Sequence, residues 1–111
     1  MGRLDHLPRR VLEDGLIVHE ATTFRARLLG LAFVRPPPAD HALLIPHCRS
    51  VHTFGMRFPI DVAFVDERGR VLRTERGVKA CRVLTCRGAF AVLERVSPTR
   101  PRVVRAAASE P

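Results

Sequence analysis

The chain has 111 residues, a formal net charge of +8 and a sequence pI near 11.3, and its 46% hydrophobic residues are enough for the core of one domain. The charge comes from 18 arginines and the single Lys79, and Asn, Gln, Tyr and Trp are absent. This skew is typical of codon bias in a GC-rich genome rather than of a designed binding surface, and the scarcity of amides also suits a thermophile. Because no apolar stretch reaches the length of a membrane span or forms the core of a signal peptide, we expect a cytoplasmic protein without membrane contact.

A β-hairpin is the first predicted element, after an N-terminal extension at residues 1–9. Apolar runs at residues 10–13 and 16–19 flank Asp14-Gly15, a pair that is a strong short-range signal for a hairpin turn.

One short helix is expected next. Either Thr22 or Thr23 can cap it, and the apolar residues that follow recur at helical spacing on one face, at Phe24, Leu28 and Leu31. The prolines at 36–38 cannot continue a helix and predict a stiff exposed connector.

A second hairpin dominates the middle of the chain. Residues 60–65 are β-branched, aromatic or apolar on both faces and predict a central strand, whereas residues 70–75 alternate and predict a strand nearer an edge. The loop between them, Asp66 to Gly69, ends in a glycine suited to positive φ. Further strands are expected at 42–45 and 88–94, with irregular links at 47–56 and 77–87.

Residues 52–66, followed by Gly69-Arg70-Val71-Leu72, resemble the signature of the bacterial and archaeal domain of unknown function family numbered 192; they read HTFGMRFPIDVAFVD. Residues 25–31 and 89–94 are similar to its early helix and late strand. The resemblance implies one domain over residues 10–94, a mostly β (α+β) fold built as a compact antiparallel sandwich or jelly-roll-like barrel with one short N-terminal helix. It implies no established activity.

Residues 95–111 depart from the family pattern and form an atypical basic C-terminal segment with a frayed end. Residues 97–101, with two prolines, stand where the family has a small-residue turn and a last strand led by Gly-Asp. Whether this segment supplies the last strand stays open.

A metal site is the first candidate chemistry. Thiolates and imidazoles are the ligands that zinc prefers, and four of five residues would complete a tetrahedral site: His47, Cys48, His52, Cys81 and Cys86. Neither Cys-x2-Cys nor His-x3-His spacing occurs, so we expect buried or reduced thiols and no cofactor.

A small hydrolase-like enzyme is the second candidate, with Cys48 or Thr53 as nucleophile, His52 as base and Asp61 as the residue that orients it. The favoured alternative is structural: the Asp61 carboxylate accepts backbone N–H groups of the His52 to Phe58 loop and fastens it. Whether the protein is an enzyme therefore stays open.

Nucleic acid is the third candidate. The high pI predicts electrostatic attraction to phosphate, and Phe54 and Phe58 have faces for base stacking. The arginines are dispersed and no nucleic-acid-binding motif occurs, so we expect weak non-specific binding without sequence specificity.

The loop from Val51 to Pro59 is the last candidate. Phe54, Met56 and Phe58 surround Gly55, and they form either an apolar lip over a small-ligand pocket or, the favoured interpretation, alternate strand residues packed in the core.

We therefore expect an accessory module that binds a small ligand or a protein, with hydrolase-like chemistry as the alternative. Ligand, partner and oligomeric state do not follow from the sequence. The candidate functional residues are His52, Thr53, Phe54, Met56, Pro59 and Asp61.

Overall fold

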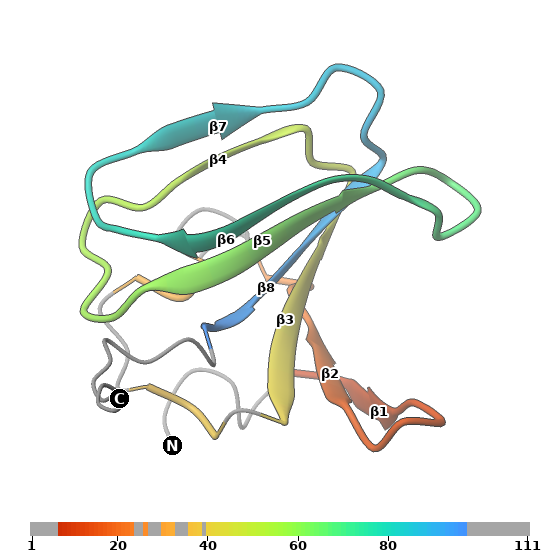
Figure 1. Ribbon diagram of the computed structural model, residues 1–111. Coiled ribbons are helices and arrows are strands. Elements are labelled where there is room, and N and C mark those ends of the chain that lie inside the picture. Colours follow the sequence, from red (N-terminus) through yellow and green to blue (C-terminus); the bar gives the residue numbers. More distant parts are fainter. Residues whose placement is uncertain (1–6, 24–25, 27–29, 33–35, 39, 98–111) are drawn as a thin grey trace, which may run out of the picture.

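The fold is mostly β. The computed structural model describes residues 7–23, 26, 30–32, 36–38 and 40–97. The described strands are β1 (Arg9–Val11), β2 (Ile17–Glu20), β3 (His41–Pro46), β4 (Ser50–His52), β5 (Ile60–Val65), β6 (Val71–Val78), β7 (Val83–Thr85) and β8 (Ala91–Val96). Six of them form one open sheet in the order β1-β2-β3-β8-β5-β6, and β4 and β7 form a second sheet, which lies over β5 and β6 in Figure 1.

The central hairpin is confirmed. β5 lies between β8 and β6, and β6 is the edge strand of the larger sheet. In the turn, Asp66 Oδ1 accepts the N–H groups of Arg68 and Arg70, both at 2.9 Å, and Gly69 has a φ of +82°. These N–H groups have no partner strand in the turn, and the Asp66 carboxylate accepts their hydrogen bonds instead. A polar loop that ends in glycine therefore predicts this hairpin.

The first hairpin is confirmed as well. β1 and β2 pair antiparallel around Asp14 and Gly15; Asp14 Oδ1 accepts the Leu16 N–H at 3.0 Å and Gly15 has a φ of +88°.

The expected antiparallel sandwich or jelly-roll-like barrel needs correction in two respects. β2 and β3 pair parallel, with His19 opposite Leu43, so the larger sheet is mixed. Parallel neighbours need a long crossover, and residues 21–40 provide it. The larger sheet also ends in the edge strands β1 and β6, so it is an open sheet and not a barrel.

Both expected irregular links contain a strand. β4 lies inside residues 47–56 and β7 inside residues 77–87, and the two pair antiparallel with Val51 opposite Leu84. β6 also runs on to Val78. Strands of three residues are too short to show a periodic pattern, so β4 and β7 could not be recognised from the sequence.

No helix is established in the part of the chain that the structure describes. The helix expected after Thr23 falls mainly on residues 24, 25 and 27–29, which lie outside the described residues. At its margins, Thr23 Oγ1 accepts the Ala26 N–H at 3.0 Å, and the Gly30 N–H donates to the Ala26 carbonyl at 2.9 Å.

The main core lies on one face of the larger sheet. The side chains that alternate onto this face are buried: Leu43, Ile45, Ile60, Val62, Phe64 and Val92. Val51 of β4 is buried against them and Leu84 of β7 packs on the same cluster, so the smaller sheet covers this face. The loop that leaves β4 and the turn that enters β7 therefore lie together, beside the start of β5 and the end of β6.

Candidate functional site

Asp61 lies on β5, opposite an irregularity in β6. The pairing register shifts between Ile60 and Val62, and the extra β6 residue forms a bulge in which Gly77 has a φ of +61°. Asp61 Oδ1 accepts the Gly77 N–H at 2.9 Å, and the Asp61 side chain is buried. The carboxylate thereby supplies an acceptor where the regular ladder is interrupted.

Arg76 adds little to this anchor. Its guanidinium lies 3.8 Å from Asp61 Oδ2, and its side chain is 74% exposed. An ion pair of this length at the surface contributes little to stability, so the Gly77 bond is the main contact of the carboxylate among the described residues.

Thr53 anchors the chain that follows the bulge. It is fully buried, and its Oγ1 donates to the Lys79 carbonyl at 2.7 Å and accepts the Arg82 N–H at 2.8 Å. Its own N–H donates to the Arg82 carbonyl at 2.8 Å. One buried hydroxyl and one peptide group therefore hold both ends of the turn from Lys79 to Arg82.

Asp61 and Thr53 thus fix a single stretch, residues 77–82, which we call the anchored segment. It begins at the Gly77 bulge and contains Cys81, a non-glycine residue with a φ of +68°. A left-handed conformation costs an L-residue about 1–2 kcal/mol, and such strain persists where surrounding contacts determine the backbone. The Thr53 bonds to Lys79 and Arg82 are those contacts.

Two hollows adjoin the anchored segment, and Lys79 borders both. The basic hollow, of about 240 Å³, is lined by Glu75, Arg76, Gly77, Val78, Lys79, Arg82 and Leu84. The apolar hollow, of about 220 Å³, is lined by Met56, Arg57, Phe58, Pro59, Lys79 and Ala80. The sequence singled out Met56 and Pro59 but not Lys79 or Arg82, because an isolated basic residue in a chain rich in arginine carries no signal.

The three residues expected to form an apolar lip differ in their exposure. Phe54 is 49% exposed, Met56 is buried and Phe58 is half-buried. Residues 53–59 form a loop between β4 and β5, so the strand alternation that favoured core packing does not hold here. Met56 packs in the core while it also lines the apolar hollow.

The proposed catalytic residues make hydrogen bonds with backbone groups. The Thr53 hydroxyl is buried and donates to a carbonyl, the Cys48 Sγ donates to the Ser50 carbonyl at 3.2 Å, and His52 Nδ1 accepts the Phe54 N–H at 3.2 Å. Asp61 is directed at Gly77. These contacts favour a scaffold for the loop and the anchored segment over an activated nucleophile.

The proposed metal ligands do not converge either. Among the described residues, which include all five, no group of three or more His, Cys, Asp or Glu side chains is placed to hold a metal ion. Cys81 is exposed, Cys48 and Cys86 are half-buried, and His47 packs edge-on against Phe90.

Glu94 is a buried polar residue that sequence reasoning missed. Its side chain lies in the core face of β8 and accepts the Leu31 N–H at 3.2 Å. A Cβ on Gly30 would lie 2.7 Å from Glu94 Oε1, so this close approach requires glycine. Burial raises the pKa of Glu94 to about 7, and the hydrogen bond from Leu31 acts in the opposite direction. The sequence does carry a sign of this buried carboxylate: Glu94 lies two residues from Val92 and from Val96, so it shares a strand face with them.

A histidine pair was missed as well. His19 on β2 is buried, and its Nε2 lies 2.8 Å from Nδ1 of His41 on β3, with the rings stacked. Such a bond requires one ring to donate and the other to accept. The parallel pairing of β2 and β3 brings the two together, and that pairing was not expected from the sequence.

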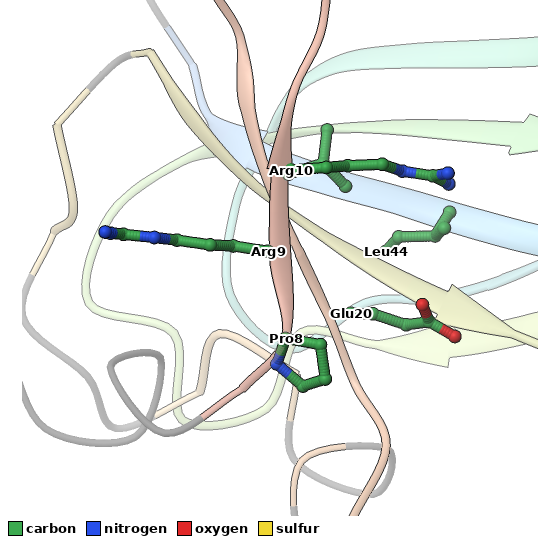
Figure 2. A pocket seen from close by; sticks show the side chains of 6 residues that line it. Pro8, Arg9, Arg10, Glu20 and Leu44 are labelled. Carbon is green, nitrogen blue, oxygen red and sulfur yellow. The ribbon is translucent and has the colours of Figure 1, made fainter.

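A third, smaller hollow of about 100 Å³ lies on the opposite face of the larger sheet, and Figure 2 shows it from close by. Arg10, Glu20 and Leu44 point to one side of the strands, whereas Arg9 points to the other. Its lining has two arginines, Arg9 and Arg10, and one carboxylate, Glu20, beside three apolar residues.

The fold and site together define a small, mostly β domain with an anchored segment beside two hollows. The chain belongs to the DUF192 family, described as an uncharacterized ACR, which matches residues 11–98. No curated protein matches the sequence significantly. In the described part of the chain, no helix has the length and apolar character needed to cross a bilayer.

Two solved structures share the fold. One, from Sinorhizobium meliloti 1021, is described as a "putative transcription regulator"; it is 22% identical, with a TM-score of 0.66 over 80% of this chain and 78% of that chain. The other is a protein of unknown function from Novosphingobium aromaticivorans DSM 12444, 17% identical, with a TM-score of 0.65 over 88% of this chain and 87% of that chain. At these identities the likeness shows the fold alone.

Proposed function

We propose that the protein is a small-ligand-binding module whose ligand lies in the two hollows beside the anchored segment. The observation that carries the proposal is the convergence of Asp61 and Thr53 on this one segment. Asp61 fixes its first residue, Gly77, and Thr53 fixes Lys79 and Arg82. A backbone held at both ends loses less conformational entropy when a ligand binds.

The surroundings of the segment support the same role. β-Bulges and strained residues concentrate at functional sites, and the anchored segment has one of each, at Gly77 and at Cys81. Lys79 lines both hollows, and each is smaller than a typical pocket for a drug-sized ligand. A ligand that spans both would contact the loop at Met56 and the segment together.

The test is a titration of ¹⁵N-labelled protein with a panel of small-molecule fragments, followed by NMR. The chain contains no Trp or Tyr, so intrinsic fluorescence would report little. We expect at least one fragment to shift the amide signals of residues 56–58 and 77–82 saturably. Lys79→Ala should weaken that binding, because Lys79 borders both hollows.

Arg68→Ala is the matched control, since Arg68 is an exposed cation in the β5–β6 turn and lines neither hollow. It should leave the titration unchanged. A panel that shifts only signals elsewhere, or binding that survives Lys79→Ala unchanged, would contradict the proposal.

A further inference from the structure

We propose that the ligand is a small amphipathic anion, with its carboxylate or phosphate in the basic hollow and an apolar body in the apolar hollow. This inference rests on the binding role proposed above and specifies its chemistry. It follows from the different linings of two hollows that share Lys79.

The basic hollow has an excess of positive charge. Arg76, Lys79 and Arg82 line it, and Glu75 is the acidic residue among its described lining residues. Glu75 already accepts a hydrogen bond from Arg73 Nε at 2.8 Å, so part of its charge is compensated from outside the hollow. The remaining lining is apolar or glycine, which leaves an anion as the complementary ligand group.

Hydrogen bonds from Thr53 and Asp61 fix the backbone that carries these three cations. Thr53 holds the carbonyl of Lys79 and both backbone groups of Arg82, and the Asp61 bond to Gly77 fixes the residue that follows Arg76. Two of the three are arginines, whose planar guanidinium matches a carboxylate or phosphate with two parallel hydrogen bonds.

The apolar hollow adds the second half of the ligand. Met56, Phe58 and Pro59 provide hydrocarbon surface, and the charged side chains in its lining are Arg57 and Lys79. An anion without an apolar body would leave this surface in water. Burying methylenes of a ligand there removes apolar surface from water and stabilises the complex.

The experiment compares matched probes by NMR at constant ionic strength. Hexanoate and hexyl phosphate carry both halves, hexanamide lacks the charge, and acetate and inorganic phosphate lack the apolar body. We expect hexanoate or hexyl phosphate to shift the amides of residues 56–58 and 77–82, and hexanamide, acetate and inorganic phosphate to bind at least about tenfold more weakly. The stronger of the two six-carbon anions identifies the head group.

Substitutions test which cation binds the anionic group of the ligand. Arg82→Gln should weaken binding of the six-carbon anion by about tenfold, whereas Arg68→Gln, outside both hollows, should not.

Equal binding of hexanamide and hexanoate at these residues would overturn the anionic inference and leave the binding module standing. Equal binding of hexanoate and acetate would overturn the apolar half, and equal losses in Arg82→Gln and Arg68→Gln would show unspecific attraction to a basic surface. If none of the probes moves these signals while an unrelated fragment does, the amphipathic anion is excluded; if no fragment does, the module is excluded too.

Discussion

Asp61 Oδ1 accepts the N–H of Gly77 at 2.9 Å across a bulge between β5 and β6. From sequence, the favoured donors for this carboxylate were backbone N–H groups of the loop that precedes β5. The donor is a backbone N–H, but it belongs to β6. The carboxylate therefore connects the central hairpin to the anchored segment, and its loss should be measurable as a loss of stability.

We predict that Asp61→Ala lowers the free energy of unfolding by about 1–3 kcal/mol, because the Gly77 N–H is left without its acceptor in a poorly hydrated place. A loss of 1 kcal/mol lowers the melting temperature of a domain of this size by about 4–8 °C. Asp61→Asn retains a side-chain oxygen and should recover most of the stability. Chemical denaturation of both variants beside the parent measures the effect.

Asp66→Ala is the control for that experiment. Asp66 accepts two backbone N–H groups in an exposed turn, where water can replace it, so a smaller loss is expected. An Asp61→Ala variant as stable as the parent would contradict a structural role and revive the alternative in which Asp61 serves an enzyme site.

Thr53 gives the second prediction. Thr53→Val keeps the shape of the side chain but removes the hydroxyl, which leaves the Lys79 carbonyl and the Arg82 N–H unpaired. We expect a loss of about 1–3 kcal/mol in unfolding free energy and faster hydrogen exchange of the Arg82 amide. Thr53→Ser should restore the protection of Arg82. Unchanged exchange at Arg82 in Thr53→Val would show that the hydroxyl does not hold the turn.

The two hairpins were predictable and the site was not, for the same physical reason. Asp14-Gly15 and the Asp66 to Gly69 loop fix their turns through contacts a few residues apart, which a sequence displays directly. The parallel pairing of β2 with β3 and the antiparallel pairing of β4 with β7 join residues that are distant in the chain. Thr53 and Asp61 could be singled out, but their common partner at residues 77–82 required the fold.

Metal removal gives the third prediction. The ligand spacing is poor for zinc, so the protein should fold without it. Elemental analysis after native purification should find no stoichiometric zinc, and the melting temperature should not change when a chelator is added. One equivalent of zinc together with a large drop of the melting temperature in chelator would refute this prediction.

The fourth prediction concerns the pH dependence that Glu94 imposes. Burial raises the pKa of this carboxyl from 4.5 to about 7 in the folded protein. A raised pKa means that the folded state favours the protonated form. Its contribution to stability is therefore complete below pH 4.5, declines as the pH rises to about 7, and stays lost at higher pH. The full difference between the two limits is of order 3 kcal/mol.

Glu94→Gln isolates this contribution, because the amide is uncharged at every pH and its oxygen can still accept the Leu31 N–H. Other ionisable groups titrate in both proteins, so the quantity to measure is the difference in unfolding free energy between variant and parent, at pH 5 and at pH 8. We expect the unfolding free energy of Glu94→Gln, minus that of the parent, to be about 1–3 kcal/mol larger at pH 8 than at pH 5. The reason is that only the parent must hold a charged carboxylate in the core at pH 8. If the difference is the same at both pH values, Glu94 has an ordinary pKa, and water or another partner must solvate it. A urea titration of the parent and Glu94→Gln at the two pH values decides between the two.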